Sequence, residues 1–151
     1  MLKEKKSAPD FQLKNQSGDE VRLKDLSGKK VVLYFYPRDL TPGCTQEACD
    51  FNDNLARIKK EKTVVLGVSF DDEKQHQKFI DKHKLGFDLL VDGDKEVAKA
   101  YGVYQKKTFM GREFMGIVRS TFLIDEKGKI AKIWSPVSVK GHVDEVMAAL
   151  G

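Results

Sequence analysis

The chain contains two cysteines, and both lie in one short segment. Cys44 and Cys49 are five residues apart, and a loop containing proline and glycine separates them from the apolar run at residues 31–36. This layout predicts a strand, a tight loop and a helix that begins near Cys44. Free backbone N–H groups and the positive end of the helix dipole favour a negatively charged sulfur there. Cys44 is therefore the candidate nucleophile, and Cys49 is close enough in sequence to trap an oxidised form of it.

The length and the cysteine count limit the class of protein. A chain of 151 residues suits a single domain, which we expect to span residues 1–151. A chain of this size can bury a full core without disulfides, so two cysteines point to redox or metal chemistry rather than to a structural framework. With three histidines, and with a Cys-x4-Cys spacing that zinc sites do not use, we expect no metal and no other cofactor.

Charge and hydropathy argue against several kinds of partner. The net charge is +4, and Lys residues alternate with Asp and Glu along most of the chain, which indicates a solvated surface and not a nucleic-acid interface. No apolar run approaches the roughly 18 residues of a membrane span. The charged N-terminal residues are not followed by the apolar stretch of a signal peptide. We therefore expect a cytoplasmic protein that binds neither nucleic acid nor a membrane.

The pattern of apolar residues predicts alternating strands and helices. Residues 8–23 form an N-terminal β-hairpin around a Ser-Gly turn, and a short helical turn follows it. Further strands are expected at residues 31–36, 63–69, 87–91, 119–124 and 129–134, and helices at residues 45–60, 71–83, 95–101 and 142–150. This order indicates an α/β protein with a thioredoxin-like fold, in which helices flank a central mixed β-sheet.

For some residues near the cysteines, the sequence allows either a role in the chemistry or an ordinary structural role. Arg119 begins an apolar strand, where a buried guanidinium needs a partner, but an arginine at a sheet edge would fit the same pattern. The Thr41 hydroxyl can donate and accept hydrogen bonds, and it could equally be a loop or cap residue. Glu47 lies one helical turn after Cys44 and either orients a guanidinium or faces solvent.

Three other expectations concern residues outside this group. His76 and His83 lie in a charged helical stretch, so we expect both to face the solvent. His142 is expected at the start of a helix. Residues 105–115 are rich in Lys and Phe, and we assign them no role beyond lining the mouth of a pocket.

The segment Pro37-x3-Thr41-x2-Cys44 resembles the active-site pattern of the peroxiredoxins. Several further segments match in order, and together they resemble the peroxiredoxin Q branch, also called bacterioferritin comigratory protein, over residues 8–150. These segments are Tyr34-Phe-Tyr-Pro37, Thr41-Pro-Gly-Cys44-Thr, Glu47-Ala-Cys49-Asp-Phe51, Gly67-Val-Ser69, Arg119-Ser-Thr-Phe-Leu-Ile-Asp125 and Lys140-Gly-His142. One residue departs from the pattern: Phe70 stands where this branch usually has proline.

The resemblance implies an antioxidant enzyme that reduces hydrogen peroxide and organic hydroperoxides to water and alcohols. It implies that Cys44 is the peroxidatic cysteine and Cys49 the resolving cysteine. Thr41 and Arg119 would complete the site, and Pro37 would shield it. It also implies regeneration by thioredoxin or a similar dithiol reductant, and a monomer, with a weak dimer as the alternative.

The spacing of the two cysteines places a condition on the chemistry. Residues five apart in an intact α-helix have Cα atoms about 8 Å apart and point about 140° away from each other. A disulfide needs Cα atoms within about 7 Å, so the start of the helix must unwind before Cys44 and Cys49 can join.

Two alternative functions remain open from the residues alone. A general disulfide oxidoreductase is disfavoured because the chain has no Cys-x2-Cys. A non-enzymatic, redox-gated binding module or holdase chaperone would need only the cysteines, whereas a peroxidase needs Thr41 and Arg119 as well.

Overall fold

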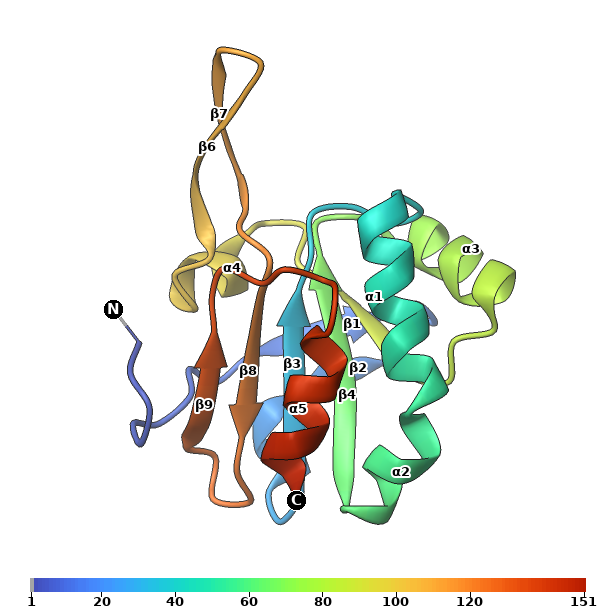
Figure 1. Cartoon of the computed structure of the whole chain (residues 1–151), viewed down its shortest axis with the longest axis vertical. Coiled ribbons are helices and arrows are strands. Elements are labelled where there is room, and N and C mark those ends of the chain that lie inside the picture. The colour runs from blue at the N-terminus through green and yellow to red at the C-terminus, as the bar shows by residue number, and fades with distance from the viewer. Residues whose placement is uncertain (1) are drawn as a thin grey trace.

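The computed structural model describes residues 2–151 as an α/β structure built on a seven-stranded sheet (Figure 1). The strands are β1 (Gln12–Asn15), β2 (Glu20–Arg22), β3 (Lys30–Phe35), β4 (Thr63–Ser69), β5 (Asp88–Val91), β6 (Tyr104–Phe109), β7 (Arg112–Ile117), β8 (Ser120–Ile124) and β9 (Ile130–Trp134). The helices are η1 (Leu23–Leu26), α1 (Pro42–Asp53), α2 (Leu55–Lys60), α3 (Glu73–His83), α4 (Glu96–Ala100) and α5 (His142–Leu150). The expected N-terminal hairpin is present as β1 and β2.

The sheet is mixed, and its centre positions the candidate site. The strand order is β2-β1-β5-β4-β3-β8-β9; β3, β4 and β5 run parallel, and the other pairings are antiparallel. Strands β3 and β4 are apolar on both faces because helices or loops cover both sides. At the carboxyl end of β3, Phe35 pairs with Ser120 of β8. Arg119, one residue before β8, is therefore beside the loop that leaves β3 for α1.

Two apolar clusters fill the space on either side of the sheet. Helices α1, α2 and α5 lie over the face that is in front in Figure 1, where Phe51, Ile58 and Val146 are fully buried. The opposite cluster includes Leu23 of η1 and Ala98 of α4. The thioredoxin-like, mixed-sheet fold predicted from the sequence is thus confirmed.

The helix predicted over residues 45–60 was wrong in its bounds. It begins earlier, at Pro42, because proline has no N–H to lose in the first turn of a helix. It is also two helices, with a break at Asn54. There the side-chain amide donates to the carbonyl of Asp50, so it competes for a backbone acceptor that the helix would otherwise use.

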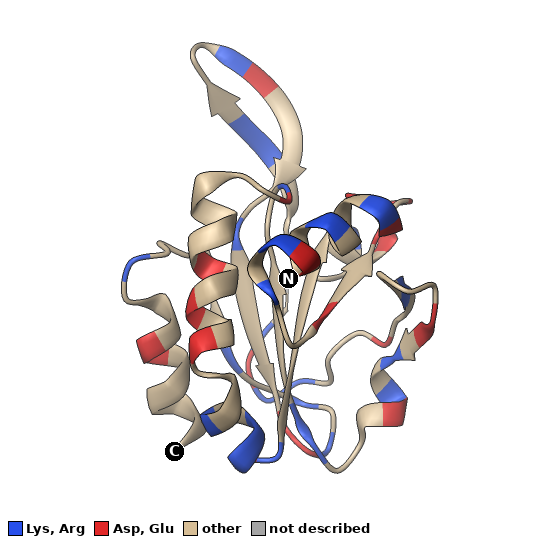
Figure 2. Cartoon of the chain, turned by 90° about the vertical axis from the view of Figure 1, so that its right-hand side faces the viewer, with Lys and Arg blue, Asp and Glu red and all other residues tan. Residues whose placement is uncertain are grey.

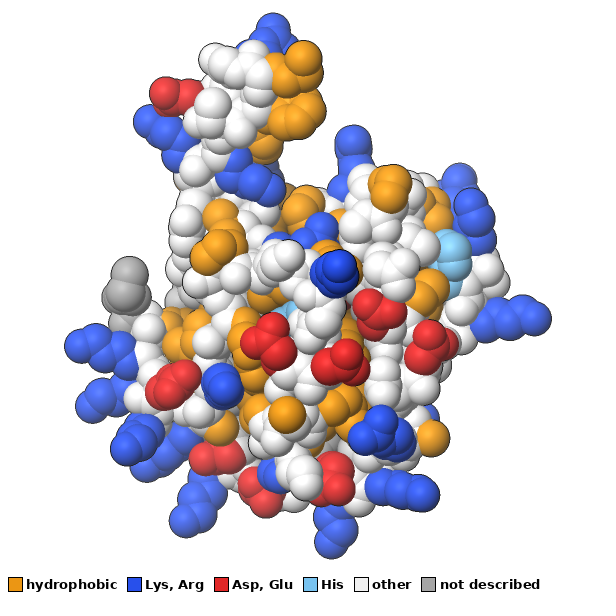
Figure 3. All heavy atoms as spheres, in the orientation of Figure 1, with side chains coloured by type: hydrophobic (Ala, Val, Ile, Leu, Met, Phe, Trp, Pro, Cys, Tyr) orange, Lys and Arg blue, Asp and Glu red, His pale blue; other side chains and the backbone are white. Residues whose placement is uncertain are grey.

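Strands β6 and β7 form a separate two-stranded hairpin that the sequence analysis did not predict. The hairpin projects from the body of the molecule beside the start of α1 (Figure 1). Phe109 and Met110 near its turn are well exposed, and apolar side chains gather along one side of its tip (Figure 3). Because neither face is buried at the tip, the segment lacks the strict apolar alternation that marks strands in a sheet.

In the view of Figure 2, helices α1 and α5 carry acidic residues and no basic ones, whereas α2 carries basic residues and no acidic ones. None of the helices formed by residues 2–151 is long and apolar enough to cross a bilayer.

Candidate active site

Cys44 lies in the first turn of α1, as the sequence predicted. Thr41 occupies the N-cap position with an extended backbone, and its carbonyl accepts the first bond of the helix from the N–H of Thr45 at 2.8 Å. The Cys44 side chain is 1% exposed. The sulfur is thus held at the positive end of a helix and away from bulk water, where a thiolate is stabilised by the helix dipole.

Arg119 supplies a cation to this sulfur. Its Nη2 donates to Cys44 Sγ at 3.3 Å, and its Nη1 donates to Glu47 Oε1 at 2.7 Å. Burial alone would lower the pKa of the guanidinium, but the charges of Glu47 and Cys44 and the hydrogen bonds to them raise it overall. Of the two readings of Arg119 from the sequence, the structure supports the buried and partnered one.

Glu47 is fully buried, which also decides between the two readings of this residue. Its Oε1 accepts from Arg119, and its Oε2 is a buried atom with no hydrogen-bond partner among residues 2–151. Loss of solvation raises the pKa of this carboxyl to about 7, against the lowering effect of Arg119. Glu47 therefore changes its charge near neutral pH, next to the guanidinium that contacts Cys44.

Gly43 belongs to the site although the sequence analysis gave it no role. A β-carbon at this position would lie 3.3 Å from Arg119 Nη2, which is tighter than an ordinary contact. Glycine thus lets the guanidinium approach the start of α1 closely enough to reach Cys44. The signal was present in the sequence, since this glycine directly precedes the cysteine.

The two cysteines have opposite electrostatic surroundings. Cys44 faces the guanidinium of Arg119, whereas partial burial and the charges of Asp53 and Asp50 raise the pKa of Cys49. Cys49 is on the same helix and is partly exposed, and both thiols are free. Of the two thiols, Cys44 thus has the cation beside it, and the surroundings of Cys49 favour its protonated form.

Thr41 and Pro37 lie in the loop between β3 and α1. The Thr41 hydroxyl donates to the carbonyl of Arg38 at 2.9 Å, so its proton is directed away from Cys44 and its lone pairs remain available to accept. Pro37 is half-buried at the start of the loop. The Thr41 hydroxyl therefore does not donate to the Cys44 sulfur in this conformation.

Lys107 is a second basic residue near the site, and it comes from the unpredicted hairpin. Its Nζ donates to the carbonyl of Ile117 at 2.9 Å. Burial and the charge of Arg119 lower its pKa, and Cys44 raises it. Lys107 of β6 is thus close enough to Arg119 and Cys44 for their charges to act on it. From the sequence, this segment was expected to line the mouth of a pocket, with no role for any single residue in it.

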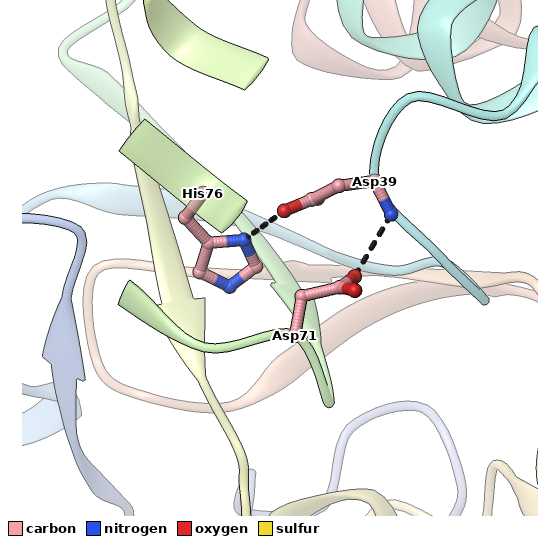
Figure 4. A group of neighbouring side chains, drawn as sticks. All are labelled: Asp39, Asp71 and His76. Atoms are coloured by element: carbon pink, nitrogen blue, oxygen red, sulfur yellow. Dashed lines mark hydrogen bonds and ion pairs between the residues drawn. The ribbon is translucent and has the colours of Figure 1, made fainter. Parts of the chain in front are cut away.

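His76 is the clearest error of the sequence analysis. It was expected to face solvent, but it is fully buried beneath the β3–α1 loop. Its Nδ1 contacts the carboxyl of Asp39, whose backbone N–H donates to Asp71 (Figure 4). These three residues have the donor types of a metal site and lie within 4.8 Å of one another. Their atoms already have protein partners, because His76 Nε2 faces the Leu90 carbonyl and Nδ1 faces Asp39. We assign the cluster a structural role within the loop.

The other two histidines also lie against the core. His142 begins α5 as expected, and its buried ring shares a hydrogen bond with the hydroxyl of Thr121 at 2.8 Å. Burial is the main reason that its pKa is lowered. His83 is partly covered, and its ring packs edge-on against Phe79.

Known proteins resemble this chain over nearly its whole length. Residues 5–133 match the model of the AhpC/TSA family. Peroxiredoxin Bcp of Bacillus subtilis (strain 168) is 50% identical over 143 residues, which are 95% of this chain and 91% of that protein. Peroxiredoxin Bcp of Escherichia coli (strain K12) is 42% identical over 140 residues, or 93% and 90% of the two chains.

Solved structures also resemble this chain over most of its length. The bacterioferritin comigratory protein of Xanthomonas campestris, whose structure was studied for its alkyl peroxide reduction activity, has a TM-score of 0.89 and 40% identity, and covers 93% of this chain and 89% of its own. A Xylella fastidiosa PrxQ mutant has a TM-score of 0.94 and 34% identity, with 99% and 96% covered.

The raised pKa of Glu47 predicts that the stability of the protein falls between about pH 4.5 and pH 7. The folded-state pKa is about 7 and the ordinary value is 4.5, so the proton stabilises the fold fully below pH 4.5, and this contribution is lost as pH rises through 7. We expect Glu47→Gln, which does not titrate, to remove a pH dependence of roughly 3 kcal/mol at most. Urea denaturation at pH 4.5, 6 and 7.5 measures it.

The exposed Glu61 offers a matched control, since Glu61→Gln removes the same charge from the surface. The stability of Glu61→Gln should change with pH in the same way as that of the wild type. Equal pH dependence in the wild type and in Glu47→Gln would contradict the assignment of the titration to Glu47.

Proposed function

The chain belongs to the AhpC/TSA family and is a peroxiredoxin, and we propose that Cys44 is its peroxidatic thiol and Cys49 its resolving thiol. The reaction is the reduction of hydroperoxides to water or alcohols. The observation that carries the assignment is the contact of Arg119 with Cys44 Sγ at 3.3 Å, together with the acidic surroundings of Cys49. A thiolate is the nucleophile in this chemistry, and only Cys44 has a cation beside it.

The first step transfers an oxygen atom to sulfur. The Cys44 thiolate attacks the terminal oxygen of the hydroperoxide, the O–O bond breaks, and the departing hydroxide or alkoxide takes up a proton to leave as water or alcohol. Cys44 becomes a sulfenic acid. The guanidinium of Arg119 can stabilise both the thiolate and the negative charge that develops on the departing oxygen, because it has donors directed at this sulfur.

The loop residues bind and shield the peroxide in this proposal. The Thr41 hydroxyl donates its own proton to the backbone carbonyl of Arg38. Its lone pairs can therefore accept a hydrogen bond from the peroxide O–H. Pro37 has no N–H, so it covers the site without offering water a donor. Glu47 holds the guanidinium in place through its bond to Nη1.

The second step forms a disulfide. The Cys49 thiol attacks the sulfur of the sulfenic acid, an S–S bond forms, and water leaves. Because both residues lie within α1, this step requires the helix to unwind between them. The far end of the segment is held in place, since Phe51 is fully buried and Asn52 bonds the backbone of Lys84 and Gly86.

A dithiol reductant must then supply two electrons to return both thiols, and we propose thioredoxin or a protein of the same chemistry. A reactive dithiol that is reduced in every cycle suits a reducing compartment, which favours the cytoplasm. We further propose that the chain acts as a monomer and folds as one domain over residues 1–151.

The assignment is tested by the intact mass of the reduced protein before and after one equivalent of hydrogen peroxide. We expect the wild type to lose two hydrogens, because the sulfenic acid condenses with Cys49. In Cys49→Ser the expected product is one added oxygen, and in Cys44→Ser no rapid reaction. An added oxygen in the wild type without a disulfide would exclude Cys49 as the resolving residue. No reaction in the wild type would exclude the peroxidase.

Removal of either group that contacts the reacting atoms should slow peroxide reduction. We expect Arg119→Ala and Thr41→Val each to lower kcat/KM more than tenfold, which is about 1.4 kcal/mol of barrier or more. Arg112→Ala is the matched control, because Arg112 is an exposed arginine on the hairpin. Steady-state peroxide consumption measures the effect, and circular dichroism checks folding. Wild-type rates in Arg119→Ala and Thr41→Val would contradict the peroxidase mechanism and leave the binding-module alternative.

Unwinding of α1 should be visible in hydrogen exchange. We expect the amides of residues 45–51 to exchange faster in the disulfide form than in the reduced form, because their helical hydrogen bonds are lost. Amides of β3 and β4 should exchange slowly in both forms and serve as the internal control. Equally slow exchange of residues 45–51 in both redox states would mean that the disulfide forms without this rearrangement.

A further inference from the structure

The loop between β3 and α1 contains a strained residue. Leu40 has a backbone φ of 65°, in the left-handed region that residues with a β-carbon rarely adopt. It is followed directly by Thr41, the N-cap residue of α1. Strain of this kind persists only where the surrounding structure holds the backbone in place. The exposed side chain of Leu40 cannot provide that support, so it must come from its neighbours.

Asp39 provides the support through both its backbone and its side chain (Figure 4). Its N–H donates to Asp71 Oδ2 at 2.8 Å. Its carboxyl Oδ2 lies 2.6 Å from His76 Nδ1, and its Oδ1 accepts from the hydroxyl of Tyr36. Asp39 is 3% exposed and His76 is 0% exposed. The residue before the strained turn is thus fixed by three hydrogen bonds away from water.

The protons of this cluster can be counted from its partners. His76 Nε2 is 2.8 Å from the carbonyl of Leu90, and a carbonyl only accepts, so Nε2 carries a proton. A second proton must lie between Nδ1 and the carboxyl of Asp39, on one or the other atom. The pair is therefore neutral as a whole. A buried, fully paired group of this kind stabilises one conformation, and the loss of one member leaves the other unpaired.

The cluster is attached to rigid parts of the fold. His76 belongs to α3, and Leu90 to β5. Asp71 is held at the end of β4 by the hydroxyl of Ser69, which donates to Asp71 Oδ2 at 2.7 Å. The loop is thus fastened to one helix and two strands.

We propose that Asp39 and His76 are positioning residues for peroxide reduction, which hold the strained turn at Leu40 and so fix Thr41 and the first turn of α1 against Arg119. The inference rests on the proposed function of Cys44. None of the hydrogen bonds or ion pairs of Asp39 and His76 involves Cys44 or Arg119, so the two residues act through the loop. They also hold the backbone at Asp39 in place while α1 unwinds.

The test compares two reactions of Cys44 in full-length protein that carries Cys49→Ser. Oxidation by hydrogen peroxide needs a thiolate and a positioned peroxide, whereas alkylation by iodoacetamide needs an accessible thiolate but no positioned peroxide. We expect Asp39→Ala and His76→Ala to lower the second-order rate constant for hydrogen peroxide more than tenfold. The rate constant for iodoacetamide should change less than threefold.

A conservative variant separates positioning from charge. In Asp39→Asn the amide oxygen can still accept from Tyr36, and the amide nitrogen can donate to His76 Nδ1. We expect this variant to keep the peroxide rate constant within threefold of the parent. If Asp39→Asn is as slow as Asp39→Ala, hydrogen-bonded positioning is not the cause and the proposal is wrong.

The control is Asp72→Ala, at the N-cap of α3, the helix that contains His76. Asp72 caps α3 by accepting from the N–H of Gln75, and its loss weakens α3 without removing a bond to the loop. Its peroxide rate constant should not change. Unchanged peroxide rates in folded Asp39→Ala and His76→Ala would show that the cluster serves stability alone, and would overturn the proposal.

Two further outcomes are decisive. If neither alanine variant folds, Tyr36→Phe removes one hydrogen bond from Asp39 and is expected to slow the peroxide reaction but not alkylation; an unchanged peroxide rate would contradict the proposal. If the parent itself does not react with hydrogen peroxide, the proposed function fails, and the inference fails with it. A reactive parent with unaffected variants refutes the inference alone.

Discussion

The arrangement of this site depends on one shared cation. The guanidinium of Arg119 lies between the sulfur of Cys44 and the carboxylate of Glu47, and it is mostly buried. A buried cation needs partners for its donors, and Glu47 Oε1 and Cys44 Sγ accept from its two terminal nitrogens. The fold meets this requirement by pairing β8 with β3, which brings the residue before β8 to the start of α1. The absence of a side chain on Gly43 allows the final approach.

Helix α1 must satisfy two opposing demands. It must be ordered to present Cys44 to Arg119, and it must open if Cys44 and Cys49 are to join. Two features lower the free energy that is needed to unwind its first turns. The Thr41 side chain does not cap the helix, and a missing cap weakens a helix by about 1 kcal/mol. The helix is also short, because Asn54 interrupts it. The buried Phe51 keeps the rest of α1 attached to the core while the start moves.

Sequence patterns predicted the parts of this structure that depend on local chemistry. The buried strands are apolar β-branched runs, and Cys44 follows a strand and a proline-containing loop, so their places could be predicted. His76 could not be placed in this way, because its burial depends on a partner 37 residues earlier in the chain. The position of Arg119 could be predicted, but its contact with Cys44, which lies 75 residues earlier, depends on the pairing of β8 with β3. The β6–β7 hairpin was missed because the side chains at its tip are largely exposed, so that no buried face imposes an alternation of apolar residues.

The different surroundings of the two thiols also bear on the order of events. Asp50 and Asp53 act on Cys49 because the helix holds all three residues at a fixed spacing. If Cys49 resolves the sulfenic acid, the intact helix therefore keeps it protonated and far from Cys44 at once. Unwinding removes both restraints together, since it changes the distance between the sulfurs and the fixed arrangement of acids around Cys49. The same conformational change would then bring Cys49 to Cys44 and make the Cys49 thiol more reactive. The disulfide would therefore form only after the helix has opened.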